Sequence, residues 1–495
     1  MFDTIIKNGT IIDGSGSPGY RADIAIKNGK IVLISDNISD DARYIDASGL
    51  IVAPGFIDSH SHADAKILQF PQQHEKLEQG ITTSIAGQCG GSAAPSVDFS
   101  FGSFLHNVAE CELGANFLCF VGHGTIRKAI MGDRGDSPTP EEMVKIESLL
   151  RECFEHGAAG LSFGLFYAPG CYATTEEAVR LARIAAEYHK PISAHIRRES
   201  DELIEATSEF IAIAKESGAR SILSHHKSVQ RRNWGKTQQT LKLLDDAILD
   251  GVDIYCDVYP YCATSTRFSQ AFVPHQWRAG GTAALIAAIN DKEKYTINKE
   301  HIYKINGQDF SWIIINNCDN HEEIVGLRLD EISAKWNMDP YDTAMKLIVD
   351  SNDQCNASFF SICEADFKRV LSWDRSMICT DSGMAGQMQM HHPRMTGSFP
   401  RAIGRYVRQQ SVVSMEAMIN KMTGLPADVY NIRNKGYIKV GYDADICIFD
   451  PNYIIDQADF VDCKKKAKGL NYVLVDGKIV VEDAIHNGVC LGKVL

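Results

Sequence analysis

The sequence lacks the features that mark several large protein classes, and these absences narrow its function. It has no run rich in lysine and arginine, and its formal net charge is −13, so we expect no nucleic-acid partner. No apolar run approaches the roughly eighteen residues of a membrane span, and residues 1–12 do not resemble a secretory signal. The fourteen cysteines include no CxxC pair. We therefore expect a soluble cytoplasmic protein, without a membrane partner, that acts on small molecules.

The stretch GFIDSHSH at residues 55–62 is the most informative motif. It is an apolar run that ends in two histidines one residue apart, His60 and His62. The two-residue period of a β-strand places both side chains on one face, so both imidazoles can reach one metal ion. Taken alone, such a pair is equally compatible with a packing or hydrogen-bonding role, because neutral histidine fits many polar surroundings.

Further residues of metal-binding type follow other strand-like runs. Cys89 follows ITTSIAG, His195 follows PISA, His225 follows SILS and Asp381 follows SMICT. The runs ANFLCFVG, GAAGLSFG and DIYCDVYPY bring the predicted strands to eight, with helical patterning between them. A (β/α)8 TIM-like barrel builds its active site from the carboxyl ends of its strands. The sequence therefore predicts an α/β barrel with a metal-dependent hydrolase site at those ends.

The two ends of the chain have a different texture. Short alternating strands and turn sequences fill the first 54 residues, and similar strands return in GYIKVGYDADICIFDP and YVLVDGKIVVED. We expect one small β-sandwich built from both termini, residues 1–54 and 410–495, beside a catalytic barrel over residues 55–409. Between about 267 and 339 the strand and helix alternation breaks, and the charged, β-rich sequence there predicts an inserted lid over the pocket.

Several motifs, in order along nearly the whole chain, resemble a known family. PGFIDSHSHAD, the late Asp381 and a C-terminal segment containing ADI and FD resemble the amidohydrolase superfamily. GQCGGS, GLSFGLFYAPG, HIRRES, SHHK, DVYPY and HPRMTGSFPR resemble its D-aminoacylase, or N-acyl-D-amino-acid deacylase, branch. The sequence departs from the family at Gln88, which is usually asparagine, and at Met395-Thr396, in a segment that usually carries an aromatic residue. These departures bear on substrate preference more than on chemistry.

The resemblance implies a zinc centre with one tight position and a weaker one beside it. The tight position is expected to take a thiolate and two imidazoles, from Cys89, His195 and His225. A thiolate with two imidazoles and an open water position is also a sound catalytic zinc site on chemical grounds. The weaker position is expected to take the remaining candidates, His60, His62 and Asp381.

Two alternatives concern the metal ligands. His225 is preferred to His226, because adjacent residues point to opposite faces of a strand and the family motif favours the first. Many relatives bridge two metals with a carboxylated lysine on the fourth strand, but GAAGLSFG contains no lysine, and Cys89 is expected to replace it. This weakens the alternative function, a cyclic-amide or N-carbamoyl hydrolase of the hydantoinase or dihydroorotase type.

The implied reaction is zinc-dependent hydrolysis of the amide bond of an N-acyl-D-amino acid to a D-amino acid and a carboxylate. Zinc lowers the pKa of its water from about 15.7 to roughly 7. Asp381 is expected to take the proton of that water and return it to the departing amine. The alternative for Asp381 is a role as metal ligand or strand cap only. The preference for D over L substrates is implied by the resemblance alone.

The substrate is expected to bind at the barrel mouth. The resemblance implies that the α-carboxylate and the acyl amide are held by Lys227, Tyr167, Tyr259 and Ser265. Lys227 is the strongest of these candidates, because a lysine makes a charge-assisted contact with a carboxylate. Ordinary aromatic packing is the alternative role for the two tyrosines. Arg267 is a candidate partner for an acidic substrate side chain, with a solvated surface arginine as the alternative.

A different class of function is an assembly scaffold, since some amidohydrolase-like proteins have lost their metal ligands. This chain keeps every expected ligand, and internal repeats and low-complexity tracts are not evident. Metal content distinguishes the two classes.

Overall fold

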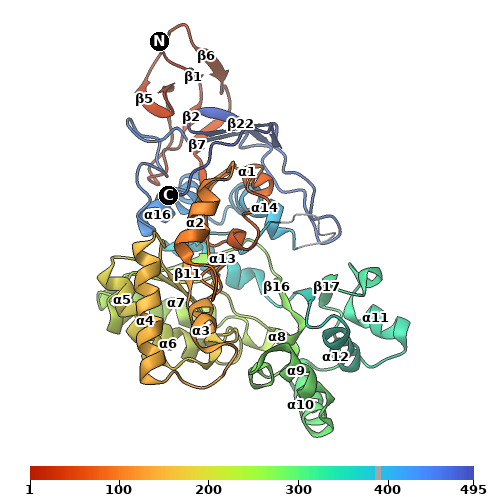
Figure 1. Ribbon diagram of the computed structural model, residues 1–495. Coiled ribbons are helices and arrows are strands. Elements are labelled where there is room, and N and C mark those ends of the chain that lie inside the picture. The colour runs from red at the N-terminus through yellow and green to blue at the C-terminus, as the bar shows by residue number, and fades with distance from the viewer. Residues whose placement is uncertain (385–391) are drawn as a thin grey trace.

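The computed structural model describes residues 1–384 and 392–495, with a parallel barrel at its centre (Figure 1). In the described chain eight strands, one of them in two short parts, follow one another in parallel around the barrel. Nearly all of their residues are buried, as expected for parallel strands with side chains inside and helices outside. This is the α/β barrel that the sequence predicts. Its strands are β8 (Phe56–Asp58), β9 (Ile81–Ala86), β10 (Asn116–Cys119) with β11 (Val121–Gly122), β12 (Leu161–Gly164), β13 (Ile192–His195), β14 (Ser221–Leu223), β15 (Ile254–Val258) and β19 (Ser376–Ile378).

The barrel closes between its first and last strands, just beyond their carboxyl ends. The backbone amide of Asp381 donates to the carbonyl of His60 (2.9 Å), and that of His62 donates to the carbonyl of Ser382 (3.1 Å). Two segments more than three hundred residues apart in sequence are thereby held side by side. Both carry residues that the sequence assigns to the metal site.

Helices between the strands cover the outside of the barrel (Figure 1). At the start of one of them the Thr139 hydroxyl accepts from the amide of Glu142, whose carboxylate accepts from the amide of Thr139. The next helix, α5 (Thr175–Glu187), carries buried Ala178, Leu181 and Ala185 at helical spacing, which gives it one apolar face. The helices outside the inserted unit are α1 (His74–Leu77), α2 (Phe101–Ala109), α3 (His123–Met131), α4 (Pro140–Glu155), α5 (Thr175–Glu187), α6 (Leu203–Ser217), α7 (Thr237–Leu249), α13 (Glu364–Ser372), α14 (Arg394–Arg401), α15 (Met415–Met422) and α16 (Gly424–Val429).

Strands from both ends of the chain form two further sheets, at the top of Figure 1. In the larger one, β20 pairs antiparallel with β7, which leads directly into β8 of the barrel. A shared apolar core includes Ile6 and Ile24 from one end and Ile446 and Leu474 from the other. The predicted boundaries at residues 54 and 410 stay a prediction. The strands are β1 (Thr4–Lys7), β2 (Thr10–Ile11), β3 (Tyr20–Arg21), β4 (Asp23–Lys27), β5 (Lys30–Ser35), β6 (Arg43–Asp46), β7 (Ile51–Pro54), β20 (Ile446–Phe449), β21 (Leu470–Val475), β22 (Lys478–Glu482) and β23 (Ile485–His486).

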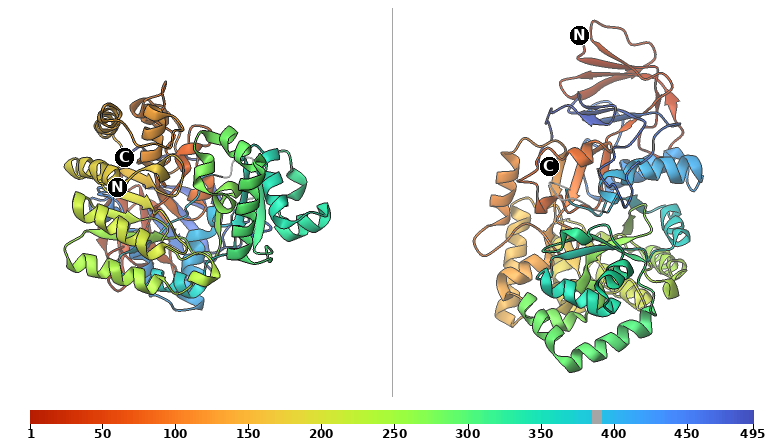
Figure 2. Two further views of the ribbon diagram at one scale, coloured as in Figure 1. Left: turned by 90° about the horizontal axis from the view of Figure 1, so that it is seen from below. Right: turned by 90° about the vertical axis from the view of Figure 1, so that its right-hand side faces the viewer.

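An inserted unit between β15 and β19 projects to one side of the barrel, as Figure 1 and the left view of Figure 2 show. Its antiparallel sheet has the order β16-β18-β17, and it has an apolar core of its own that includes Phe268 and Phe310. It comprises β16 (Thr264–Arg267), α8 (Phe268–Phe272), α9 (Gly281–Asn290), α10 (Lys292–Asn306), β17 (Ile313–Cys318), α11 (Leu329–Trp336), α12 (Pro340–Asp350) and β18 (Cys355–Phe359).

The inserted unit differs from the sequence prediction in two respects. Residues 292–306, predicted to be β-rich, form a helix, because the Asp291 side chain accepts from the amides of Glu293 and Lys294 and so caps it. The unit also continues past residue 339, because β18, late in the sequence, pairs between β16 and β17 and completes the sheet.

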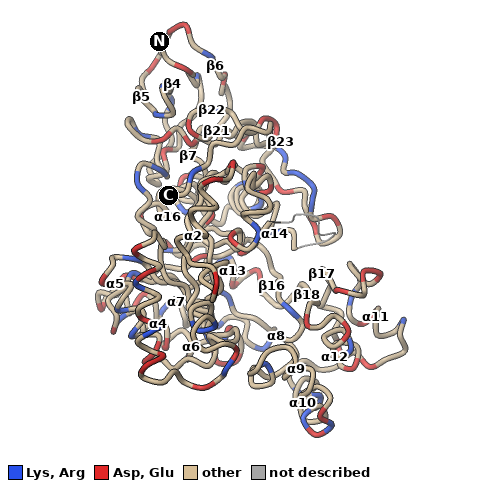
Figure 3. The backbone as a smooth tube through the Cα atoms, in the orientation of Figure 1, with Lys and Arg blue, Asp and Glu red and all other residues tan. Residues whose placement is uncertain are grey.

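Charges of both signs are interspersed over the barrel helices and the inserted unit (Figure 3). The chain has 50 lysines and arginines against 63 aspartates and glutamates. Figure 3 shows the acidic residues spread over many elements rather than gathered on one. Within the described residues, no helix has both the length and the apolar character needed to cross a bilayer.

Candidate metal and catalytic site

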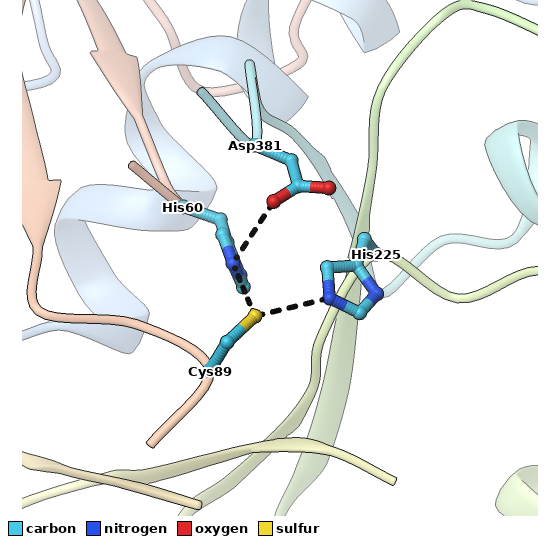
Figure 4. A group of neighbouring side chains, drawn as sticks. All are labelled: His60, Cys89, His225 and Asp381. Atoms are coloured by element: carbon cyan, nitrogen blue, oxygen red, sulfur yellow. Dashed lines mark hydrogen bonds and ion pairs between the residues drawn. The ribbon is translucent and has the colours of Figure 1, made fainter. Parts of the chain in front are cut away.

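Cys89 lies at the meeting point of the imidazoles at the carboxyl ends of the barrel strands (Figure 4). Its Sγ is 3.3 Å from His60 Nε2, 3.2 Å from His225 Nε2 and 3.8 Å from His195 Nδ1. Burial raises the pKa of the Cys89 thiol, but the imidazolium charges of His60 and His225 outweigh burial and bring that pKa well below its ordinary value. The arrangement therefore favours a thiolate among several ring nitrogens, which is a metal-binding donor set.

Asp381 approaches the same point from β19. Its Oδ1 lies 3.2 Å from His62 Nε2 and 3.6 Å from His60 Nε2. Its Oδ2 accepts from Nη1 of Arg394 at 2.5 Å. Burial raises the pKa of Asp381, yet Arg394 and the imidazoles outweigh it, and the pKa lies well below its ordinary range. This carboxylate is thus held ionised, with one oxygen facing the histidines.

Left-handed backbone conformations aim three of these side chains at the site. Cys89 (φ 55°), His225 (φ 36°) and Asp381 (φ 47°) all have positive φ, which is uncommon outside glycine and costs free energy. Such strain is typical of functional sites, where the surrounding structure holds it in place.

The glycines beside Cys89 have a steric role. A Cβ on Gly87 would lie 2.0 Å from the carbonyl oxygen of Phe120, and one on Gly90 would lie 2.3 Å from the amide nitrogen of Gly164. The loop can therefore pack this closely against the neighbouring strands only with glycine at both positions. The GQCGG sequence thus fixes where the sulfur lies.

A second layer of carboxylates orients the rings. Glu199 Oε1 lies 3.1 Å from His225 Nδ1, which leaves the other nitrogen of that ring to face Cys89. Asp257 accepts from the amide of His225 through Oδ1 (2.6 Å), and its Oδ2 lies 3.5 Å from His60 Nδ1. Carboxylates in this position are typical of metal-binding histidines, whose tautomer and ring orientation they fix.

The structure distinguishes the two adjacent histidines that follow β14. His225 faces the cluster, whereas Nε2 of His226 lies 2.7 Å from the hydroxyl of Thr240 on α7. His226 is buried on the opposite side of the strand, where it packs rather than contributes a donor to the site.

A cavity of about 580 Å³ opens above the cluster, between the barrel mouth and the inserted unit. Of the predicted substrate-binding residues, four line it, namely Lys227, Tyr167, Tyr259 and Ser265.

Two of these side chains, those of Lys227 and Tyr167, have contacts that fix their positions, whereas a third has a buried hydroxyl without a hydrogen-bond partner among the described residues. The Nζ of Lys227 donates to Oε1 of Glu199 at 2.6 Å. The ring of Tyr167 packs 4.7 Å from that of His195, and the hydroxyl of Tyr259 is buried without a hydrogen-bond partner among the described residues. These contacts hold two polar groups at the cavity wall in positions from which a substrate can be contacted.

Arg267 is not brought into this cavity. Its side chain is 47% exposed and its Nη1 lies 3.7 Å from Asp353 Oδ2, at the end of β16 where α8 begins. Only the preceding residues of β16 line the cavity. This placement favours the surface alternative, and the contact with a substrate side chain stays a prediction.

Several residues of the site are not among those that the sequence predicts, although three of them lie within its motifs. Arg394 lies in HPRMTGSFPR, Glu199 in HIRRES and Asp257 in DVYPY. Arg198 and Arg278 also line the cavity. A charged residue near a predicted ligand was the only indication available for most of them, and it does not say which side chain faces the site.

A family model described as the amidohydrolase family matches residues 43–294 and 377–481. The chain is 33% identical to a D-aminoacylase of Alcaligenes xylosoxydans xylosoxydans, over 100% of this chain and 97% of that protein. Among solved structures, it is similar to N-acyl-D-glutamate deacylase from Bordetella bronchiseptica in complex with zinc and a phosphonate inhibitor that mimics the tetrahedral reaction intermediate. The TM-score is 0.86 and the identity 32%, over 100% of this chain and 99% of that one.

It is also similar to a D-aminoacylase structure that describes a binuclear metal centre with one-metal activation and second-metal attenuation. The TM-score is 0.87 and the identity 31%, with both chains covered in full.

Proposed function

The chain belongs to the amidohydrolase family, and we propose that it hydrolyses the amide bond of N-acyl-D-amino acids, releasing a D-amino acid and a carboxylate, with zinc as cofactor. The observation that carries this proposal is the convergence of His60, Cys89, His225 and Asp381, whose donor atoms lie within 4.8 Å of one another beside the cavity that His225 and Asp381 line. The full-length similarity to D-aminoacylase supports the substrate class.

The donor groups fit zinc. A thiolate and imidazole nitrogens are the ligands that zinc prefers, and three protein ligands leave a position for water. Cys89, His195 and His225 would hold the tight ion, and His60, His62 and Asp381 would form a weaker position beside it. Bound zinc lowers the pKa of a coordinated water and polarises the substrate carbonyl.

Asp381 moves the proton. Its depressed pKa keeps it ionised at neutral pH, and Arg394 holds Oδ2, so Oδ1, which faces the histidines, is the oxygen that accepts a proton from the attacking water. The same oxygen then returns the proton to the departing amine nitrogen. A carboxylate that exchanges a proton in this way contributes about 10²–10⁴-fold to the rate.

The cavity walls bind and orient the substrate. Lys227 contacts the α-carboxylate by a charge-assisted hydrogen bond, and Tyr259 and Ser265 complete that contact. Tyr167 orients the acyl amide beside His195. The inserted unit forms a lid that excludes bulk water, which strengthens each of these electrostatic contacts. Residues 1–54 and 410–495 form a β-sandwich from both termini, which supports the barrel.

The test is the release of amine from N-acetyl-D- and N-acetyl-L-amino acids, measured with ninhydrin for Met, Leu, Glu and Asp. We expect release from the D-forms only, lost after chelation and restored by zinc. Cys89→Ala should lose bound zinc, whereas Cys111→Ala, a matched change at the end of α2, should keep it. No release by the zinc-loaded protein would contradict the proposal and point to cyclic amides or N-carbamoyl compounds.

A further inference from the structure

Arg278 is a buried cation without a carboxylate. It ends the short helical turn η4 (His275–Arg278), lines the cavity and is only 7% exposed. Its Nε and Nη1 have no hydrogen-bond partner among the described residues, and no carboxylate of those residues lies within ion-pair distance. Burying a charged group without a partner costs several kcal/mol of folding free energy in general. Proteins therefore bury an unpaired charge at few positions.

The other arginines that line the cavity in the described chain are all paired. Arg198 Nε lies 3.3 Å from Glu202, Arg232 Nε lies 2.7 Å from Asp201, and Arg394 Nη1 lies 2.5 Å from Asp381. The carboxylate whose charge acts on Arg278 is that of Asp353, which instead pairs with Arg267. Arg278 therefore stands apart as the guanidinium whose partner is missing.

The segment that carries Arg278 is held in place. The hydroxyl of Tyr172 donates to the carbonyl of His275 at 2.8 Å, and the amide of Gly280 donates to the carbonyl of Asp133 at 3.0 Å. These two bonds tie both ends of η4 to the barrel side of the cavity. The backbone that carries the guanidinium is thus fixed before substrate arrives, which lowers the entropic cost of binding an anion.

Arg278 and Lys227 both line the cavity but come from different elements of the fold. Lys227 follows β14 and donates to Glu199 at the level of the metal ligands. Arg278 comes from the start of the inserted unit, near Tyr172 and Tyr167, and the ring of Tyr167 packs on that of His195. A substrate with its α-carboxylate at Lys227 can therefore present a second carboxylate to Arg278.

We propose that Arg278 binds the side-chain carboxylate of the substrate, so that the chain is a deacylase for dicarboxylic D-amino acids, N-acyl-D-glutamate or N-acyl-D-aspartate. This rests on the proposed function and names the substrate class of the same site. A planar guanidinium matches a carboxylate with two parallel hydrogen bonds, and Arg278, which lines the cavity, has two nitrogens, Nε and Nη1, without a hydrogen-bond partner among the described residues.

The first test compares kcat/KM for N-acetyl-D-glutamate and its neutral isostere N-acetyl-D-glutamine. The wild type should prefer the acid. Arg278→Met should lose about 10–100-fold on the acid while changing about threefold or less on the amide, because a hydrogen bond to a charged group is lost only with the acid. Arg278→Lys should recover part of the loss. Arg151→Gln, a surface arginine on α4 that pairs with Glu187, is the matched control and should leave the preference unchanged.

Three kinetic results would overturn the proposal. An equal loss on both substrates would assign Arg278 to the α-carboxylate. The wild type could instead favour N-succinyl-D-methionine over N-acetyl-D-methionine and lose that preference in Arg278→Met. That result would show that Arg278 contacts the acyl group. A loss of selectivity in Arg267→Gln but not in Arg278→Met would move the contact to Arg267.

A second test measures binding without turnover. D-glutamate should raise the thermal midpoint of the zinc-loaded wild type more than D-glutamine does, and Arg278→Met should abolish that difference. Because the free guanidinium is uncompensated, Arg278→Met alone should unfold at the same temperature as the wild type or higher; a clearly lower midpoint would show an internal partner and overturn the proposal. If the wild type cleaves no N-acyl-D-amino acid, the proposed function fails, while D-glutamate binding still decides the role of Arg278.

Discussion

Two buried polar clusters lie next to each other where β8 and β19 end, and they are built in opposite ways. In the seam cluster, Lys76 Nζ donates to Asp58 Oδ2 (2.7 Å), to the Thr380 hydroxyl (2.7 Å) and to the Ser382 carbonyl (3.1 Å). The Thr380 amide donates to Asp58 Oδ1 (2.8 Å). Asp58, Lys76 and Thr380 are fully buried, and the charged groups are paired and hydrogen-bonded.

The metal-site cluster begins where the seam cluster ends, at His60 and Asp381. Here donor atoms face one another around Cys89, and His60 Nδ1 and Asp257 Oδ2 are buried 3.5 Å apart without a hydrogen bond. The Asp381 backbone is in the left-handed region. The charged groups of the seam cluster are all paired within the protein, and their contacts join β8 to β19. The metal-site cluster has buried donor atoms that only a bound ligand would pair.

Asp381→Asn should have the largest effect on activity. The amide cannot accept a proton, so kcat should fall about 10²–10⁴-fold. Zinc content, measured by atomic absorption, should stay near the wild-type value, because the tight position is assigned to Cys89, His195 and His225. Turnover near the wild-type level would remove Asp381 from the proton transfer.

Asp456→Asn is the matched control for that change. Asp456 is also buried and pairs with an arginine, Arg401, at 2.9 Å, but outside the metal site. It should lose stability while keeping turnover per folded molecule. If both variants lost turnover equally, the loss in Asp381→Asn would reflect a broken ion pair rather than chemistry.

Lys76→Met tests the seam cluster. Removing the lysine leaves Asp58 buried without its counter-charge, which should lower the free energy of unfolding by about 3–5 kcal/mol. The double variant Asp58→Leu/Lys76→Met should recover much of this, because no charge is then left unpaired. Urea unfolding of the three proteins measures both numbers. A double variant no more stable than Lys76→Met would show that hydrogen bonds, rather than charge pairing, hold the seam.

The sequence predicted the metal site better than the seam. His60, His62, Cys89, His195, His225 and Asp381 all follow apolar runs, and a parallel barrel brings such positions together whatever the details of packing. Lys76 lies in HEKLEQG, which has the pattern of an exposed helix. Its burial depends on Thr380, which is 304 residues away, and no local pattern encodes such a contact.

The inserted unit was the least predictable region. Residues 292–306 contain β-branched and aromatic residues that favour strands, but the Asp291 cap and the packing of buried Ile302 decide for a helix. Two arginines of this region differ in position in a way that no sequence pattern indicates. Arg267, next to a recognised motif, faces Asp353 at the surface, whereas Arg278, in no recognised motif, lines the cavity.

Lys227→Ala tests the boundary between substrate binding and metal ligation. Loss of a charge-assisted contact to the α-carboxylate should raise KM about 10–100-fold. Because Glu199 contacts both Lys227 and His225, a different outcome is informative. A fall in kcat with KM unchanged would mean that Lys227 acts by positioning His225, and would remove its carboxylate role. Steady-state kinetics on one substrate separates the two.

The smallest effect is expected at a third buried lysine, at the opposite end of β19. Lys421 donates to the carbonyls of Trp373 and Ser376 and lies within ion-pair distance of no carboxylate in the described chain. Burial lowers its pKa from an ordinary 10.5 to about 8. Between those values the unfolded chain binds more protons than the folded one, so the stability contributed at this position rises with pH.

The difference in free energy of unfolding between the wild type and Lys421→Met should therefore increase by up to about 1.4 kcal/mol per pH unit from pH 8 to pH 10. Other groups that titrate in this range, such as exposed lysines, are common to both proteins and cancel in the difference. Denaturant unfolding at pH 7, 8, 9 and 10 measures it. If the difference in free energy of unfolding did not change with pH, Lys421 would stay charged in the folded protein. Carbonyl dipoles would then stabilise its buried ammonium as well as the Asp58 carboxylate stabilises that of Lys76.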